Sequence, residues 1–147
     1  MAIAVALLVP SLARADDSAS VAKANQTLQL AGYPPLPAKG EKLQCYAWNG
    51  QGAGIYARFI LKEPSDLAAY LASLPSWLEK ASPIPANLFS PPLAQASWFT
   101  PSSTAKAYVL YGGRIWHAAP EIFRLYVDPE SSTLYLYYTW NNKRTYP

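Results

Sequence analysis

Few residues in this chain could act as catalytic bases or metal ligands. His117 is the only histidine and Cys45 the only cysteine among 147 residues, so a zinc site built from these residue types would lack ligands. A serine or cysteine nucleophile would need His117 as its base, and the sequence contains no Gly-x-Ser-x-Gly motif. We expect His117 to be a hydrogen-bonded residue of a strand, and we predict neither a metal site nor a cofactor.

The carboxylates leave one catalytic mechanism open. Most of them fall at predicted caps and turns, where they have local structural roles: Glu63, Asp66, Glu79, Glu121, Asp128 and Glu130. Two carboxylic acids placed across a glycosidic bond suffice for hydrolysis, but no spacing here singles out such a pair. A small hydrolase with a carboxylate mechanism is our third hypothesis, after two that involve binding alone.

The aromatic residues favour binding over catalysis. Eleven tyrosines and five tryptophans exceed what the core of one domain needs, and both residue types are enriched at the energetic centres of protein interfaces. The first hypothesis is a non-catalytic domain that binds another protein, as an inhibitor or an immunity-type factor. The alternative is a glycan or cell-wall binding module, in which Trp98, Trp116 or Tyr137 stacks on sugar faces.

The N-terminus predicts export. Residues 2–9 are all apolar, a run too short for the roughly 20 residues that span a bilayer, and Ala13-Arg14-Ala15 provides the small-x-small pattern of a cleavage site. Residues 1–15 are therefore predicted to be a signal peptide and residues 16–147 a single secreted or periplasmic domain without a membrane span. Because no Lys or Arg precedes the apolar run, an uncleaved N-terminal anchor is the alternative.

Charge and cysteine usage restrict the partners. The chain without its predicted leader has eleven basic and nine acidic residues, a balance that does not support nucleic-acid binding, which needs clustered Lys and Arg. Cys45 has no second cysteine with which to form an internal disulfide. It is expected to be a buried strand residue, with an intermolecular disulfide as the alternative.

The last third of the chain predicts a β-hairpin and a candidate binding surface. Residues 122–127 and 133–140 alternate with the period of two typical of half-buried strands, and Asp128-Pro129 suits a turn between them. Pairing Asp128 with Thr133 makes one face aliphatic. The other face carries the four residues that we predict to bind the partner: Arg124, Tyr126, Tyr135 and Tyr137.

Two segments bear on whether that face is available. The proline-rich segment 82–101 has no predicted regular structure and carries Trp98 and Phe99, which either belong to the binding surface or pin the segment onto the core. If this segment or the N-terminal helix covers the tyrosines, the sheet is buried on both sides. The sequence leaves these alternatives open.

The remaining elements predict an α+β domain. Helices are expected at residues 18–31, ending at Gly32, and at 65–74, capped by Ser65. Two further hairpins are expected, one from strands 43–48 and 55–61, the other from strands 107–111 and 114–118 around Gly112-Gly113. The fold class is thus an antiparallel sheet of about six strands in three hairpins, with the stronger helix packed on one face.

Overall fold

A computed structural model describes residues 11–49, 52–76, 78–81, 94–109, 115–116, 119–128 and 130–141. They form an antiparallel sheet with two α-helices, confirming the α+β class. The body of the sheet has five strands in the order β1-β2-β7-β6-β4: β1 Glu41–Asn49, β2 Gly52–Ile60, β7 Thr133–Asn141, β6 Ala119–Asp128 and β4 Lys106–Val109. Two short strands lie beside it, β3 (Glu79–Ala81) next to β4 and β5 (Ile115–Trp116) next to β6.

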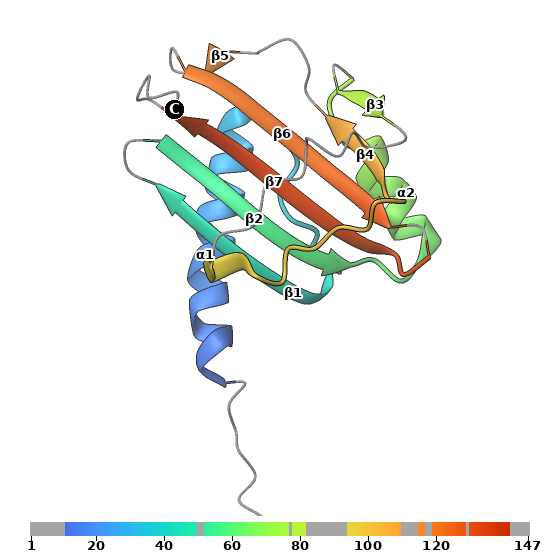
Figure 1. Cartoon of the computed structure of the whole chain (residues 1–147), viewed down its shortest axis with the longest axis horizontal. Helices are drawn as coiled ribbons and strands as arrows, with labels where there is room; N and C mark the ends of the chain where they lie inside the picture. Colours follow the sequence, from blue (N-terminus) through green and yellow to red (C-terminus); the bar gives the residue numbers. More distant parts are fainter. Residues whose placement is uncertain are drawn as a thin grey trace, which may run out of the picture.

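Both helices pack on the same face of the sheet (Figure 1). Helix α1 (Ser11–Ala31) lies mainly on β1, and α2 (Pro64–Ala72) lies near the other end of the sheet. The opposite face carries the segment that includes the short 3-10 helix η2 (Ala94–Ala96). Helix α1 begins at Ser11, so it is longer than predicted and starts within the predicted leader.

The helix ends follow local backbone preferences. Gly32 has φ +85°, a conformation that favours glycine, and α1 ends there as predicted. Ser65 does not cap α2, contrary to expectation: Glu63 is the N-cap, without a side-chain cap hydrogen bond. The reason is that Pro64, with its fixed φ and no N–H to satisfy, is well suited to the first helical position.

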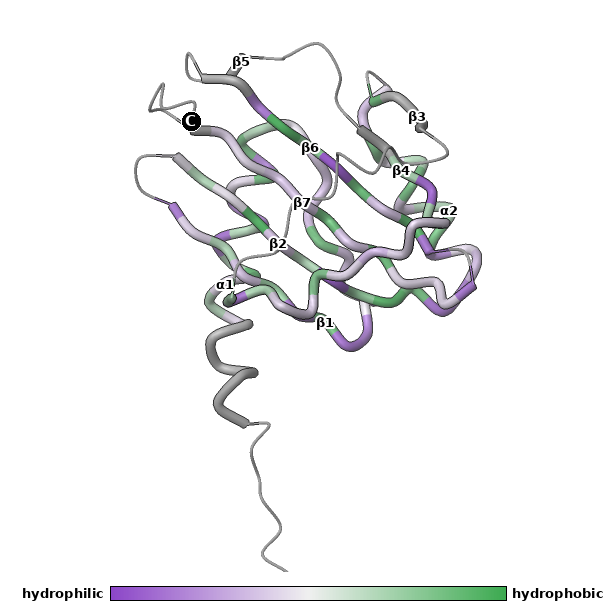
Figure 2. The backbone as a smooth tube through the Cα atoms, viewed as in Figure 1, coloured by the Kyte–Doolittle hydropathy of each residue, from purple (hydrophilic) through white to green (hydrophobic). Residues whose placement is uncertain are grey.

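Two of the three predicted hairpins are present. In the last one, β6 and β7 pair with Asp128 opposite Thr133 and Leu125 opposite Leu136, the register expected from the sequence. The Asp128 side chain accepts a hydrogen bond from the Glu130 N–H at 3.1 Å and so stabilises the turn. In the first hairpin, β1 pairs with β2, and β2 begins at Gly52, inside the predicted loop. Figure 2 shows hydrophobic and hydrophilic residues alternating along β6.

The middle hairpin is not confirmed. Val109 was expected opposite Trp116, but Val109 pairs with Arg124 of β6 and Trp116 pairs with Ala119. Gly112-Gly113 predicted a turn that would pair β4 with β5. Instead, β4 pairs with β6 of the main sheet over four residues. The turn itself and His117 lie outside the described residues.

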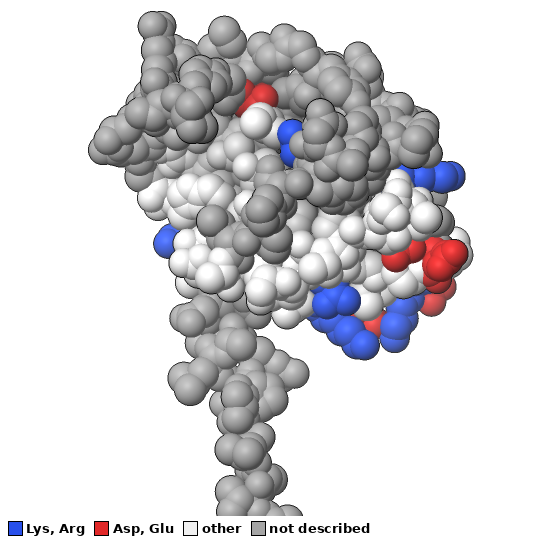
Figure 3. All heavy atoms as spheres, viewed as in Figure 1, with Lys and Arg blue, Asp and Glu red and all other residues white. Residues whose placement is uncertain are grey.

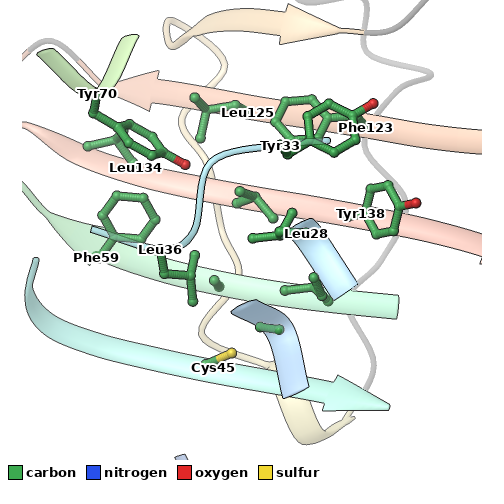
Figure 4. Close-up of a cluster of buried hydrophobic side chains, with 14 of the residues drawn as sticks. Leu28, Tyr33, Leu36, Cys45, Phe59, Tyr70, Phe123, Leu125, Leu134 and Tyr138 are labelled. Atoms are coloured by element: carbon green, nitrogen blue, oxygen red, sulfur yellow. The ribbon is translucent and has the colours of Figure 1, made fainter. Parts of the chain in front are cut away.

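The helix-side core is closed by the segment that follows α1. Tyr33 stacks on Phe123 with ring centroids 4.3 Å apart and an interplanar angle of 11°, and Leu36 is buried near Phe59 (Figure 4). The Leu36 N–H donates to the Asn25 side-chain oxygen at 2.8 Å. The segment 33–37 therefore belongs to the core. Cys45 is buried in the same layer, as expected.

Replacing Tyr70 by Phe tests the packing of α2. Tyr70 packs edge-on against Phe59, and its buried hydroxyl has no hydrogen-bond partner among the described residues. Because an unsatisfied buried hydroxyl costs about 1–3 kcal/mol, Tyr70→Phe should leave the free energy of unfolding unchanged or raise it by about 1 kcal/mol, while Tyr70→Ala should lower it by about 3 kcal/mol. Urea denaturation measures both. A clear loss of stability in Tyr70→Phe would contradict the placement.

Candidate functional site

The face of the sheet opposite the helices is rich in aromatic rings, and we call it the aromatic face. Its central row crosses four strands: Tyr46 of β1, Tyr56 of β2, Tyr137 of β7 and Arg124 of β6 are successive partners in the pairing register. The rings of Tyr56 and Tyr137 have centroids 4.9 Å apart. The pairing of β2 with β7 therefore joins aromatic residues from the two hairpins into one surface.

One half of this face is closed by Phe99. Its ring contacts three tyrosines edge-on, at centroid distances of 5.1 Å to Tyr56, 6.2 Å to Tyr126 and 5.5 Å to Tyr135. Tyr126 and Tyr135 are only 2% and 7% exposed. Of the two alternatives that the sequence left open, the covered one holds for these two residues, because the segment around Phe99 packs on them.

The closed half also contains Arg58. Its guanidinium donates to the Gln44 side-chain oxygen at 3.1 Å and lies 5.8 Å from the centre of the Tyr135 ring. A cation above an aromatic face is attracted by the negative potential of the ring. Arg58 therefore ties β1 to the tyrosines of β7 through side-chain contacts.

Arg124 sets the electrostatics of the central row. It donates a hydrogen bond to the Tyr126 hydroxyl and lies 6.0 Å from the centre of the Tyr137 ring. The hydroxyls of Tyr56 and Tyr137 are hydrogen-bonded to each other. Burial, reinforced by Tyr56, raises the pKa of Tyr137 to about 12, and the positive charge of Arg124 opposes that rise. These tyrosines are therefore neutral hydrogen-bonding groups at physiological pH.

The other half of the face retains accessible rings. Tyr46, Trp48, Tyr137 and Trp98 are each half-buried, and we call this set the open strip. Tyr46 and Trp48 have ring centroids 5.6 Å apart and are tilted by 31°, and Trp48 makes the same angle with Tyr56 at 6.0 Å. Of the residues predicted to bind a partner, Tyr137, Arg124 and Trp98 are half-buried at or beside this strip, whereas Phe99 is buried as a core residue.

Trp48 lies directly over Gly54, its partner on β2. A Cβ atom placed on Gly54 would be 1.8 Å from the indole ring, so only glycine leaves room for this arrangement. Covering a strand glycine with an aromatic ring from the neighbouring strand is a known way to stabilise a sheet. Sequence analysis missed this contact because it assigned Gly54 to a flexible loop. The signal that could have revealed it is an aromatic residue on one strand facing a glycine on the next.

Most charged side chains of the described residues gather at one end of the molecule (Figure 3), whereas Arg58 and Arg124 lie among the rings of the aromatic face. Two ion pairs belong to that charged end, Lys62 with Glu41 at 2.8 Å and Lys39 with Asp66 at 3.2 Å. Within the described residues there is no cluster of three His, Cys, Asp or Glu that could bind a metal ion. No helix among them is long and apolar enough to cross a membrane.

Comparison with protein-family models, curated proteins and solved structures gives no match to this chain. The function is therefore inferred from the geometry of the aromatic face alone.

Replacing Gly54 by Ala tests the Trp48 contact. The new methyl group must displace the indole, so we expect a loss of about 1–3 kcal/mol in the free energy of unfolding, as for other overpacked sites, together with a shift of tryptophan fluorescence. The control is the same substitution in a Trp48→Ala background, where the space above Gly54 is empty and the loss should largely disappear. An equal loss in both backgrounds would show that the indole does not occupy this position.

Proposed function

We propose that this chain is an exported, non-catalytic domain that binds another protein through the open strip. The observation that carries the proposal is the set of half-buried rings held on paired strands, with Trp48 fixed over Gly54 and flanked by Tyr46 and Tyr56. A partner can desolvate such rings without first ordering them, which lowers the entropic cost of association. Aromatic residues in this setting are the usual energetic centres of protein interfaces.

The buried tyrosines support the strip and take no direct part in binding. Tyr126 and Tyr135 hold Phe99, and Phe99 in turn contacts Trp98 at a centroid distance of 6.4 Å. This chain of contacts fixes the position of Trp98 at the margin of the open strip. The binding role is thus moved from the tyrosine pair of the last hairpin to Tyr46, Trp48, Tyr137 and Trp98.

A glycan is the second candidate partner. The shallow 31° tilt between Tyr46 and Trp48 and the position of the indole flat against the glycine backbone resemble a platform on which a sugar ring could stack. A sugar that stacks on an aromatic ring needs little beyond the ring itself. A protein partner also requires a surface that fits the shape around the rings. The two candidates are separated by what the domain retains from its own source.

The experiment is affinity capture from the exported fraction of the native source, with Trp48→Ala as the test variant. Removal of an interface tryptophan typically costs 2 kcal/mol or more, so capture of a stoichiometric protein should weaken by about tenfold or more. Leu30→Ala is the matched control, because Leu30 is 65% exposed on α1, on the other side of the sheet. It should bind like the unchanged chain.

Three results would count against the proposal. Equal capture by Trp48→Ala and the unchanged chain would place the interface elsewhere. Loss of binding in both variants, with the fold of each confirmed by circular dichroism, would show that binding does not depend on the open strip in particular. Retention on insoluble wall polymer, lost in Trp48→Ala and without any protein partner, would replace the protein by a glycan.

A further inference from the structure

Strand β1 forms one edge of the sheet. It pairs with β2 from Glu41 to Asn49, with an irregularity between Glu41 and Gln44, and comes first in the strand order. Within the described part of the chain, no strand pairs with its other side. An edge strand presents a row of backbone donors and acceptors, which can pair with a further extended segment.

Only the start of β1 carries the features that normally protect an edge. Lys42 has φ +49° and the register shifts between Glu41 and Gln44, so this end bulges, and Glu41 pairs with Lys62. From Gln44 to Asn49 the pairing with β2 is regular, and the sequence Gln-Cys-Tyr-Ala-Trp-Asn contains neither a charge nor a proline. These six residues form a regular, uncharged edge about 20 Å long.

The two faces of this edge define what can pair with it. On the helix side, Cys45 and Ala47 are small and buried, so an added strand must also carry small apolar side chains there. On the aromatic side, Tyr46 and Trp48 require an uncharged neighbour. Residues 44–48 of a second copy meet both requirements, which makes the edge self-complementary.

Sheet geometry restricts how two copies can pair. The helix sides of the two copies lie on the same side of the joined sheet only when the two-fold axis passes through a residue position. An axis between two residues shifts the pairing by one residue, which exchanges the two faces of one copy. With the axis at Tyr46, Gln44 lies opposite Trp48 of the partner subunit, and Cys45 lies opposite Ala47 of the partner subunit. Both sheets then continue into one, with the two aromatic faces on the same side.

Helix α1 packs on β1 on the helix side of the sheet, so its residues 18–31 lie next to the position of an added strand. Contact with this helix is needed, since stable interfaces bury about 1,200–2,000 Å² in total, more than five paired residues provide.

We propose that the chain forms a two-fold dimer by antiparallel pairing of residues 44–48 of β1 about Tyr46. The dimer brings Tyr46 and Trp48 of both copies together, so that the open strip contains rings from two chains. This assembly goes beyond the proposed partner binding, and its test uses the purified chain alone. Failure of the dimer therefore leaves the protein-binding proposal standing on its own experiment.

Sedimentation velocity and static light scattering of the purified chain test the dimer. We expect twice the monomer mass at micromolar concentration and a return to the monomer mass in Tyr46→Lys, because a charge in the middle of an edge blocks strand pairing. Asn49→Lys, at the exposed end of β1, should raise the dissociation constant at least tenfold with less risk to the fold. Leu30→Lys, on the exposed side of α1, is the control and should remain dimeric.

Hydrogen exchange of the β1 amides gives a second measurement that does not depend on any variant. In a dimer, all amides from residues 45 to 48 are hydrogen-bonded and should exchange slowly. In a monomer, only the alternate amides that bond to β2 are protected, so fast and slow exchange would alternate along the strand. A monomer mass at all concentrations, or alternating exchange, would overturn the proposal.

Discussion

The antiparallel pairing of β2 with β7 is the contact on which both layers of this protein depend. It joins the first hairpin to the last one, and the Thr139 hydroxyl donates to the Ala53 carbonyl across a sequence separation of 86 residues at 3.2 Å. On the helix side it sets Ile55 beside Tyr138 and Ala57 beside Leu136, which are fully buried. On the opposite side it sets Tyr56 beside Tyr137. Without this pairing there would be neither a continuous core nor an aromatic face.

Burial of the sheet on both sides explains the high aromatic content. The helix side uses Tyr33, Tyr70 and Tyr138, together with two phenylalanines, within a core that is mostly aliphatic. The other side is covered by a segment of irregular structure that packs through Phe99. An irregular segment contributes few backbone hydrogen bonds to a sheet face, so large side chains must supply the contact. Because the segment covers only part of the face, the rings beyond it remain half-buried and available to a partner.

The sequence predicted local features well because they depend on neighbouring residues. Alternation and turn chemistry gave the β6–β7 register, including Tyr126 opposite Tyr135 and Arg124 opposite Tyr137. The glycine that ends α1 was equally clear, because its positive φ is a local requirement. The middle hairpin failed because β4 pairs with the distant β6. Which half of the aromatic face is covered could not be predicted, since it depends on where Phe99 packs.

The binding residues predicted from the sequence differ from those of the open strip because a sequence pattern shows only local features. The residues named from the sequence all lie on or beside the last hairpin and the Phe99 segment, where periodicity can be seen. Tyr46 and Trp48 became candidates only once β1 and β2 were joined to β7, because the row from Tyr46 to Arg124 crosses four strands. Exposure, which decides between a binding role and a core role, comes from contacts between segments far apart in the chain.

The central claim is that the aromatic face has a closed half under Phe99 and an open half around Trp48. Residue-resolved nitration of tyrosines, followed by mass spectrometry of the folded chain, measures this division directly. The structure predicts that Tyr46 reacts in the folded chain, while Tyr126 and Tyr135 react only when the chain unfolds. Nitration of Tyr126 and Tyr135 in the folded chain as fast as that of Tyr46 would contradict the account.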